Sequence, residues 1–104
     1  MKTLNAGPLT AVAPKVRMEH GGMDILVVRV GDELFAIEDR CSHGDVPLSE
    51  GELDGCLIEC WLHGSTFDLR TGVPTCPPAV SPVRTFPVSI NDHDGTPTVF
   101  VEIG

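Results

Sequence analysis

Short apolar segments alternate with turn-forming residues along the first half of the chain, and no segment has the length or spacing of a long helix. Residues 15–19, 24–30 and 33–37 combine β-branched and other apolar residues in runs of strand length. Turn sequences separate the runs, with Gly21-Gly22 after the first and Gly31-Asp32 after the second. The pattern predicts three consecutive antiparallel strands in a meander.

The last quarter of the chain repeats this pattern. Residues 83–90 and 98–103 are β-rich, and residues 91–95 between them form a turn sequence. We therefore expect two further strands near the C-terminus. The first 14 residues have no assignment from pattern alone.

The middle of the chain, residues 39–82, forms an insert between these two sets of strands. It is expected to contain only short strands, at 57–60 and 66–69, and it holds all four cysteines. The sequence thus predicts one all-β domain over residues 1–104, with antiparallel sheets and a small subdomain inserted between them.

Composition limits the classes of partner that the protein can bind and the compartment in which it is expected. Fifteen acidic against seven basic side chains give a net charge of −8, which disfavours nucleic acid and anionic membranes and favours a partner with a basic surface. There is no apolar run of the roughly 20 residues that a membrane span requires, and the N-terminus lacks the apolar segment of a signal peptide. We expect a cytoplasmic protein, in which cysteines are more often metal ligands or buried thiols than disulfides.

Two short motifs in the insert have the spacing of metal ligands. Cys41 and His43 form C-x-H, Cys60 and His63 form C-x-x-H, and sixteen residues separate the two motifs. Each motif offers one thiolate and one imidazole at the expected tip of a loop, and Gly64 would let the backbone pass close to a metal centre. Two such loops can hold one inorganic centre between them.

A set of two cysteines and two histidines suits zinc or an iron–sulfur cluster. Zinc fingers pair cysteine with cysteine on a hairpin and histidine with histidine on a helix. Here each motif mixes the two residue types, and no helix is expected after them. The spacing therefore argues against a zinc finger, and an iron–sulfur centre and a zinc-stabilised interaction module are the two interpretations that remain.

The sequence resembles the Rieske iron–sulfur family over about residues 15–103. The resemblance rests on residues 35–43 (FAIEDRCSH), 47–51 (PLSEG) and 60–72 (CWLHGSTFDLRTG), with Pro77-Pro78-Ala79 similar to the family's proline-bearing third loop. It implies a Rieske domain that binds one [2Fe–2S] cluster, with Cys41 and Cys60 on one iron and His43 and His63 on the other.

The function implied by this resemblance is one-electron transfer rather than catalysis. Ferredoxins of this type pass electrons from a flavoprotein reductase to the terminal oxygenase of a bacterial multi-component dioxygenase system. Service to another redox system, such as iron–sulfur assembly or a nitrite-reductase-like enzyme, is the alternative within electron transfer. Partner docking is expected to be transient and electrostatic.

Trp61 stands where many members of the family have proline. We expect it to shield the cluster or to shape the docking edge, with a plain packing role as the alternative. Four acidic residues near the ligand loops either steer a partner or form an ordinary charged surface: Glu50, Glu52, Asp54 and Glu59.

The remaining cysteines and histidines are not expected to bind metal. The spacings of Cys56 and Cys76 do not match a four-cysteine plant-type cluster. By two-residue alternation Cys56 should pack beneath the cluster loop, and Cys76 is a candidate exposed thiol. His20 and His93 lie in or beside turn sequences without a ligand at metal-binding spacing.

The resemblance also suggests a low reduction potential. High-potential respiratory members tie their loops with a disulfide whose cysteines would fall at Val46 and Leu62, so that bond cannot form here. They also have a tyrosine hydroxyl at the position of Phe67, whereas the serine donor is retained as Ser65. We predict a midpoint in the lower part of the range of about −150 to +300 mV.

Overall fold

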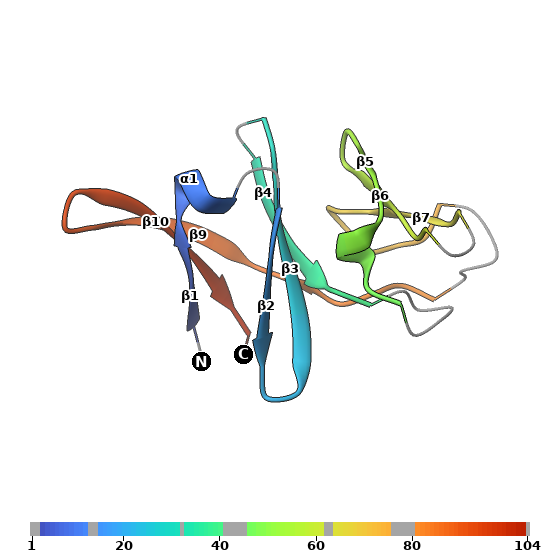
Figure 1. Cartoon of the computed structure of the whole chain (residues 1–104), viewed down its shortest axis with the longest axis horizontal. Coiled ribbons are helices and arrows are strands. Elements are labelled where there is room, and N and C mark those ends of the chain that lie inside the picture. The colour runs from blue at the N-terminus through green and yellow to red at the C-terminus, as the bar shows by residue number, and fades with distance from the viewer. Residues whose placement is uncertain are drawn as a thin grey trace.

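The computed structural model describes residues 3–12, 15–31, 33–40, 46–61, 64–75 and 81–103. This part of the chain folds into three antiparallel sheets with little helix, in an elongated molecule of 45 × 28 × 19 Å (Figure 1). The predicted all-β, antiparallel architecture is confirmed. No described helix is long and apolar enough to cross a membrane.

The central sheet has the order β2-β3-β4-β8, formed by β2 (Lys15–His20), β3 (Met23–Val30), β4 (Glu33–Glu38) and β8 (Thr85–Phe86). Strands β2, β3 and β4 pair antiparallel in sequence order, so the predicted meander is confirmed. Strand β3 is buried on both faces, because Ile25 and Val27 face one side and Leu26 and Val28 the other. Its continuous apolar run follows from this double burial.

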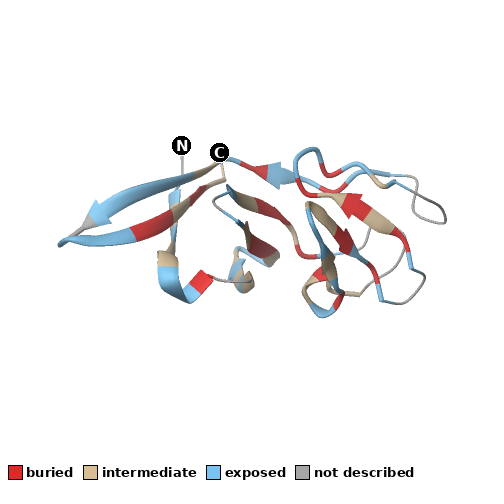
Figure 2. Ribbon diagram, turned by 90° about the horizontal axis from the view of Figure 1, so that it is seen from above, coloured by how far each residue is buried: buried red, intermediate tan, exposed pale blue. Residues whose placement is uncertain are grey.

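Two hydrophobic cores lie on the two sides of this sheet (Figure 2). The first, which we call the terminal core, has as its buried members Val12, Ile25, Val27, Ala36, Phe86, Val99 and Val101. The second, which we call the loop core, has Leu26, Val28, Ile37, Leu48, Ile58, Cys60, Phe67, Leu69 and Val83.

A second sheet, of order β1-β10-β9, covers the terminal core. It consists of β1 (Thr3–Pro8), β9 (Val88–His93) and β10 (Thr96–Glu102). The four-residue helix α1 (Leu9–Val12) leads from β1 toward the central sheet and buries Val12 completely. Within the N-terminal segment that had no assignment, residues 3–8 are therefore a strand paired with the C-terminal strand β10, and residues 9–12 are a short helix.

The expected strand 83–90 is divided in two, which corrects the prediction. Strand β8 pairs with β4 in the central sheet, whereas β9 pairs with β10 in the second sheet. Pro87 stands between them, where it donates no hydrogen bond and its carbonyl accepts one from the Glu102 amide at 2.9 Å. The turn is also shorter than residues 91–95, since His93 already pairs with Thr96 around Asp94-Gly95.

The insert leaves and re-enters the central sheet at one point. The Glu38 amide donates to the Arg84 carbonyl at 2.8 Å, so the insert runs between these residues. It contains the 3-10 helix η1 (Leu48–Glu50) and a third sheet of β5 (Leu53–Asp54), β6 (Leu57–Glu59) and β7 (Thr66–Asp68). The two short strands predicted here are present, each one residue shorter than expected.

Candidate metal centre

The second ligand motif begins directly after β6, where Cys60 is completely buried. Its amide donates to the Ser65 carbonyl at 2.6 Å, and its carbonyl accepts from the Gly64 amide at 2.8 Å. These two bonds close a tight loop between β6 and β7. Leu62 and His63, which follow Trp61 in sequence, lie outside the described residues.

Gly64 is required by the loop's backbone conformation. Its φ is +74°, in the left-handed region that favours glycine, and a Cβ placed there would meet no described atom within 4 Å. Within the described part of the chain, the φ angle alone is a reason for glycine at this position, and the close approach to a metal centre expected from sequence stays a prediction.

The first ligand motif lies between Asp39-Arg40 at the end of β4 and Val46-Pro47 before η1. Cys41 and His43 themselves lie outside the described residues, so their prediction as ligands stays a prediction. The described limbs on either side are anchored: the Asp39 amide donates to the Asp24 carbonyl at 2.8 Å, and the Ser49 amide donates to Asp39 Oδ1 at 2.6 Å.

The described limbs of both ligand loops pack on the loop core. Cys60 belongs to it, and so does Leu48, while Val46 packs against it at the end of the first loop. The structure thus brings the described limbs of the two motifs together from positions far apart in sequence. This supports a single centre held between two loops.

A third loop, which follows β7, is attached to that strand by hydrogen bonds. The Thr75 amide donates to the Thr66 carbonyl at 2.7 Å, their two hydroxyls share a hydrogen bond, and the Val83 amide donates to the Gly72 carbonyl at 2.9 Å. Pro77-Pro78-Ala79 and Cys76 fall between these anchors, outside the described residues. The limbs of this loop start and end beside β7, which leads away from the second motif.

The donor chemistry at the described end of the site fits an iron–sulfur cluster. Cys60 is a free thiol without exposure to water. As a thiolate ligand it would need the positive charge of a metal centre to compensate its own charge in this buried position. Among the described residues no three potential ligand side chains come together, because the other three predicted ligands lie outside them. Trp61 is 51% exposed next to Cys60, which places an apolar surface beside the predicted site.

Cys56 differs from its expected position. It precedes β6 at the end opposite Cys60, is half-buried and lies outside the loop core, with Sγ 3.6 Å from Arg70 Nη2. It therefore does not pack beneath the cluster loop. His20 ends β2 opposite Met23, and His93 ends β9 opposite Thr96.

Arg70 also links the insert to the central sheet. Its two terminal nitrogens donate to the carboxylate of Glu33 at 2.7 Å each, and its guanidinium lies 5.2 Å from the centre of the Phe35 ring. These hydrogen bonds lower the pKa of Glu33 and raise that of Arg70. Both side chains are about half exposed, so the pair is weakly stabilising.

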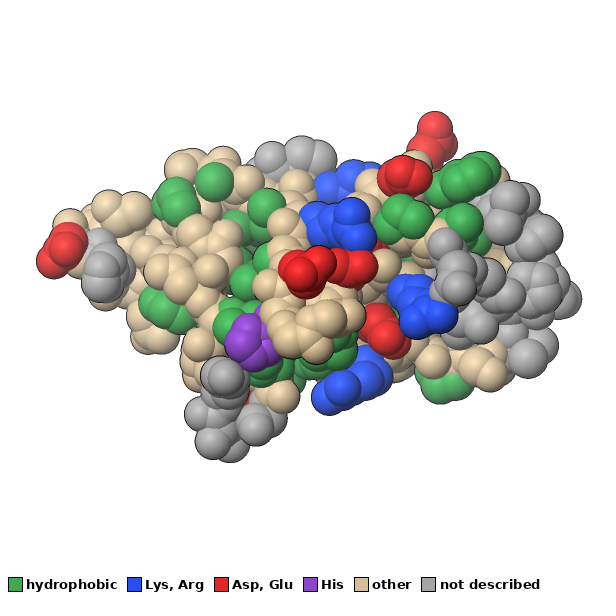
Figure 3. Space-filling view, turned by 60° about the horizontal axis from the view of Figure 1, so that its bottom comes forward, with side chains coloured by type: hydrophobic (Ala, Val, Ile, Leu, Met, Phe, Trp, Pro, Cys, Tyr) green, Lys and Arg blue, Asp and Glu red, His purple; other side chains and the backbone are tan. Residues whose placement is uncertain are grey.

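The four acidic residues expected near the loops, Glu50, Glu52, Asp54 and Glu59, are all exposed. On the face shown in Figure 3, basic and acidic described side chains are interleaved across the middle of the molecule. The excess negative charge is thus spread over several places instead of forming one patch on that face.

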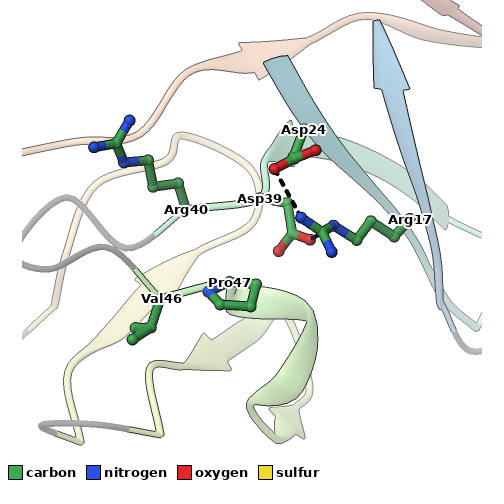
Figure 4. Close-up of a pocket in the computed structure, with 6 residues that line it drawn as sticks. All are labelled: Arg17, Asp24, Asp39, Arg40, Val46 and Pro47. Atoms are coloured by element: carbon green, nitrogen blue, oxygen red, sulfur yellow. Dashed lines mark hydrogen bonds and ion pairs between the residues drawn. The ribbon is translucent and has the colours of Figure 1, made fainter. Parts of the chain in front are cut away.

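Sequence reasoning missed Asp39 as a functional candidate. It lines a hollow beside the first ligand loop together with Arg17, Asp24, Arg40, Val46 and Pro47 (Figure 4). Its side chain is fully buried although it lies in an apparent turn sequence. Its position two residues before a candidate ligand was the available signal, but its partners are remote in sequence.

Comparison with known proteins gives consistent matches. Residues 5–87 match the family model described as the Rieske [2Fe-2S] domain. The chain is 53% identical over 72 residues to the anthranilate 1,2-dioxygenase ferredoxin subunit of Burkholderia cepacia, covering 69% of this chain and 67% of that protein. It is 44% identical over 93 residues to the biphenyl 2,3-dioxygenase ferredoxin component of Rhodococcus jostii (strain RHA1), covering 89% and 86%.

Solved structures of ferredoxins are also similar to this chain. The ferredoxin of carbazole 1,9a-dioxygenase from Nocardioides aromaticivorans IC177 superposes with a TM-score of 0.86 at 33% identity, covering 97% of each chain. A chain from a complex of reduced oxygenase and oxidized ferredoxin in carbazole 1,9a-dioxygenase gives a TM-score of 0.82 at 36% identity, covering 95% of this chain and 91% of that one.

Proposed function

Because the chain belongs to the Rieske [2Fe–2S] family and has one Rieske-type cluster, we propose that it is the one-electron carrier of a multi-component oxygenase system. The observation that carries this proposal is the match along almost the whole chain to ferredoxins that serve dioxygenases. The proposed donor is a flavoprotein reductase, and the proposed acceptor is a terminal oxygenase.

We propose Cys41, His43, Cys60 and His63 as the cluster ligands, within a single domain of 104 residues. The bound cluster would supply one-electron chemistry, because its irons accept and release a single electron. The chain's own residues do the rest. Cys60 is held in a water-free position by its hydrogen bonds to Gly64 and Ser65, and exposed Trp61 lies at the edge where a partner would approach.

The proposed role is electron transfer without substrate conversion, in the cytoplasm. The relatives are named as ferredoxin subunits or components, which supports a carrier. The free thiol of Cys56 fits a reducing compartment. With a net charge of −8, the protein is proposed to bind a basic surface on each partner transiently.

Replacement of single cysteines tests the ligand assignment. The wild-type protein should be brown and contain two irons and two acid-labile sulfides per chain, and Cys41→Ser and Cys60→Ser should lose both, since a hydroxyl is a poor ligand for this centre. Cys56→Ser is the matched control and should keep the full complement. A colourless wild-type protein with one zinc would refute the proposal, and loss of iron from Cys56→Ser would refute the ligand set.

Electron transfer itself is measured with purified partners. The chemically reduced protein is mixed anaerobically with the oxidised terminal oxygenase of an anthranilate 1,2-dioxygenase system, and reoxidation is followed by visible absorbance. We expect single-exponential reoxidation that accelerates with oxygenase concentration. A rate equal to that with buffer alone would contradict the proposed acceptor class.

A further inference from the structure

Asp39 connects three parts of the molecule at the base of the first ligand loop. Its side chain is 0% exposed, although carboxylates are rarely buried. Oδ1 accepts the Ser49 amide at 2.6 Å, and Oδ2 lies 2.9 Å from Arg17 Nε on β2. Figure 4 shows Arg17 and Asp39 pointing toward each other, while Arg40 extends away from them.

The contact with Ser49 closes the first ligand loop. Residue 39 precedes the C-x-H motif and residue 49 follows it, so a single side chain joins the two limbs across ten residues. The Asp39 amide also donates to the Asp24 carbonyl of β3, which fixes the same residue to the central sheet. The loop therefore departs from and returns to a fixed point on the most extensively paired sheet.

The carboxylate is needed as a charge, not only as an acceptor. Oδ2 is buried without a hydrogen bond of its own, and the ion pair with Arg17 is what compensates it. Removing one partner of a buried pair leaves an uncompensated charge, which costs far more than losing an exposed pair. Arg17 is half exposed and forms a second, more exposed pair with Asp24, whose Oδ2 accepts from its Nη2 at 2.7 Å.

Strand β2 also contacts the segment that leads to the second ligand loop. Lys15, two residues before Arg17 on β2, donates to the Gly51 carbonyl at 2.8 Å. Gly51 lies so close to β6 that a Cβ there would overlap the Glu59 carbonyl, and the Glu59 amide donates to the Glu52 carbonyl at 2.9 Å. The limb fixed by Asp39 thus leads directly to the residue before Cys60.

We propose that Asp39, with Arg17 as its counter-ion, is a positioning residue that fixes the loop of Cys41 and His43 relative to Cys60. This rests on the proposed ligand set. Asp39 acts through the backbone of the loop and does not itself bind the cluster. Its replacement should therefore change how the cluster is held as well as how stable the fold is.

The test compares Asp39→Asn and Arg17→Gln with Asp24→Asn as the matched control. Asp39→Asn keeps the size and an acceptor for Ser49 but removes the charge, and Arg17→Gln removes the counter-ion at a half-exposed site. Asp24→Asn neutralises the other carboxylate on Arg17 and leaves untouched the carbonyl that accepts the Asp39 amide. The readouts are the rate of bleaching by an iron chelator, the EPR spectrum of the reduced protein and the midpoint potential.

We expect Asp39→Asn and Arg17→Gln to bleach at least about tenfold faster than wild type, with altered g-values and a shifted potential. Asp24→Asn should stay within about twofold of wild type, as expected for an exposed pair. The double variant Arg17→Gln/Asp39→Asn should recover part of the Arg17→Gln loss, because no buried charge is left unpaired.

Two results would overturn the proposal. One is a set of EPR spectra, potentials and bleaching rates for the Asp39 and Arg17 variants equal to those of Asp24→Asn, even if the melting temperature falls. The other is normal cluster behaviour in Arg17→Gln beside a cluster-free Asp39→Asn. Failure of the proposed function is distinguishable from both, since it would appear as a wild-type protein without two irons per chain.

Discussion

The two cores of this molecule are built by different means, although they share the central sheet. The terminal core lies between strands of six to eight residues, β1, β9 and β10 on one side and β2 and β3 on the other. The strands β5, β6 and β7 of the insert have only two or three residues each. Ladder hydrogen bonds therefore define the first region and cannot define the second to the same degree.

The insert compensates with single contacts between remote residues. Lys15 reaches the Gly51 carbonyl, Arg17 reaches Asp39, and Arg70 reaches Glu33, so each of these pairs connects the central sheet to the insert or its base. The central sheet is the frame, and the insert is attached to it by these individual side-chain contacts.

The largest expected effect is a difference between two matched core truncations. Ile58→Ala in the loop core and Ile25→Ala in the terminal core each remove the same atoms from a fully buried isoleucine. Both should lower the free energy of unfolding by about 2–5 kcal/mol, measured by denaturant titration. Only Ile58→Ala should also accelerate bleaching by an iron chelator. Equal bleaching in the two variants would show that the cores are not functionally separate.

The central meander and the ligand motifs could be predicted from sequence because both are local signals. Runs such as 24–30 carry strand preference within themselves, and the C-x-H and C-x-x-H spacings need no knowledge of the fold. The break at Pro87 was also available locally, since proline rarely continues a paired strand.

The features that could not be predicted depend on contacts between residues remote in sequence. Strand β1 gains its partner from the far end of the chain, where Thr3 pairs with Glu102, and its own sequence has weak alternation. The burial of Asp39 depends on Arg17 and Ser49, 22 positions before and ten positions after it. Cys56 fitted a strand alternation, but the strand begins only at Leu57 and the thiol lies beside Arg70.

The next effect concerns the reduction potential and tests whether a side chain of the loop core sets it. Phe67 is fully buried in that core together with Cys60 and cannot donate a hydrogen bond. We predict a wild-type midpoint near or below about −100 mV by protein-film voltammetry, and a higher midpoint for Phe67→Tyr. If the new hydroxyl finds no acceptor, its burial should instead cost about 1–3 kcal/mol of stability without moving the potential. A wild-type midpoint above about +200 mV would contradict the low-potential assignment.

A smaller effect is expected on the rate of reoxidation by the oxygenase, and it tests which end of the molecule is the docking surface. Glu50→Gln/Glu52→Gln removes two exposed charges from the insert, and Asp92→Asn/Asp94→Asn removes two from the hairpin of β9 and β10 at the far end. We expect the first pair to slow reoxidation by the oxygenase several-fold at low salt and to weaken its salt dependence. The second pair should leave both unchanged. Equal slowing by the two pairs would indicate that net charge alone governs association.

The smallest effect concerns the Glu33–Arg70 pair that attaches the insert to the central sheet. Hydrogen bonds from Arg70 lower the pKa of Glu33 below its ordinary value of 4.5 in the folded protein. The pair's contribution is therefore fully present above about pH 4.5 and is lost as the pH falls through the lower pKa of the folded state. Melting curves of wild type and Glu33→Gln should differ slightly at neutral pH and converge in acid. The difference should stay small because both side chains are half exposed. A gap between the two proteins that widens toward low pH would have the wrong sign and would show that the pair does not hold the insert through this charge.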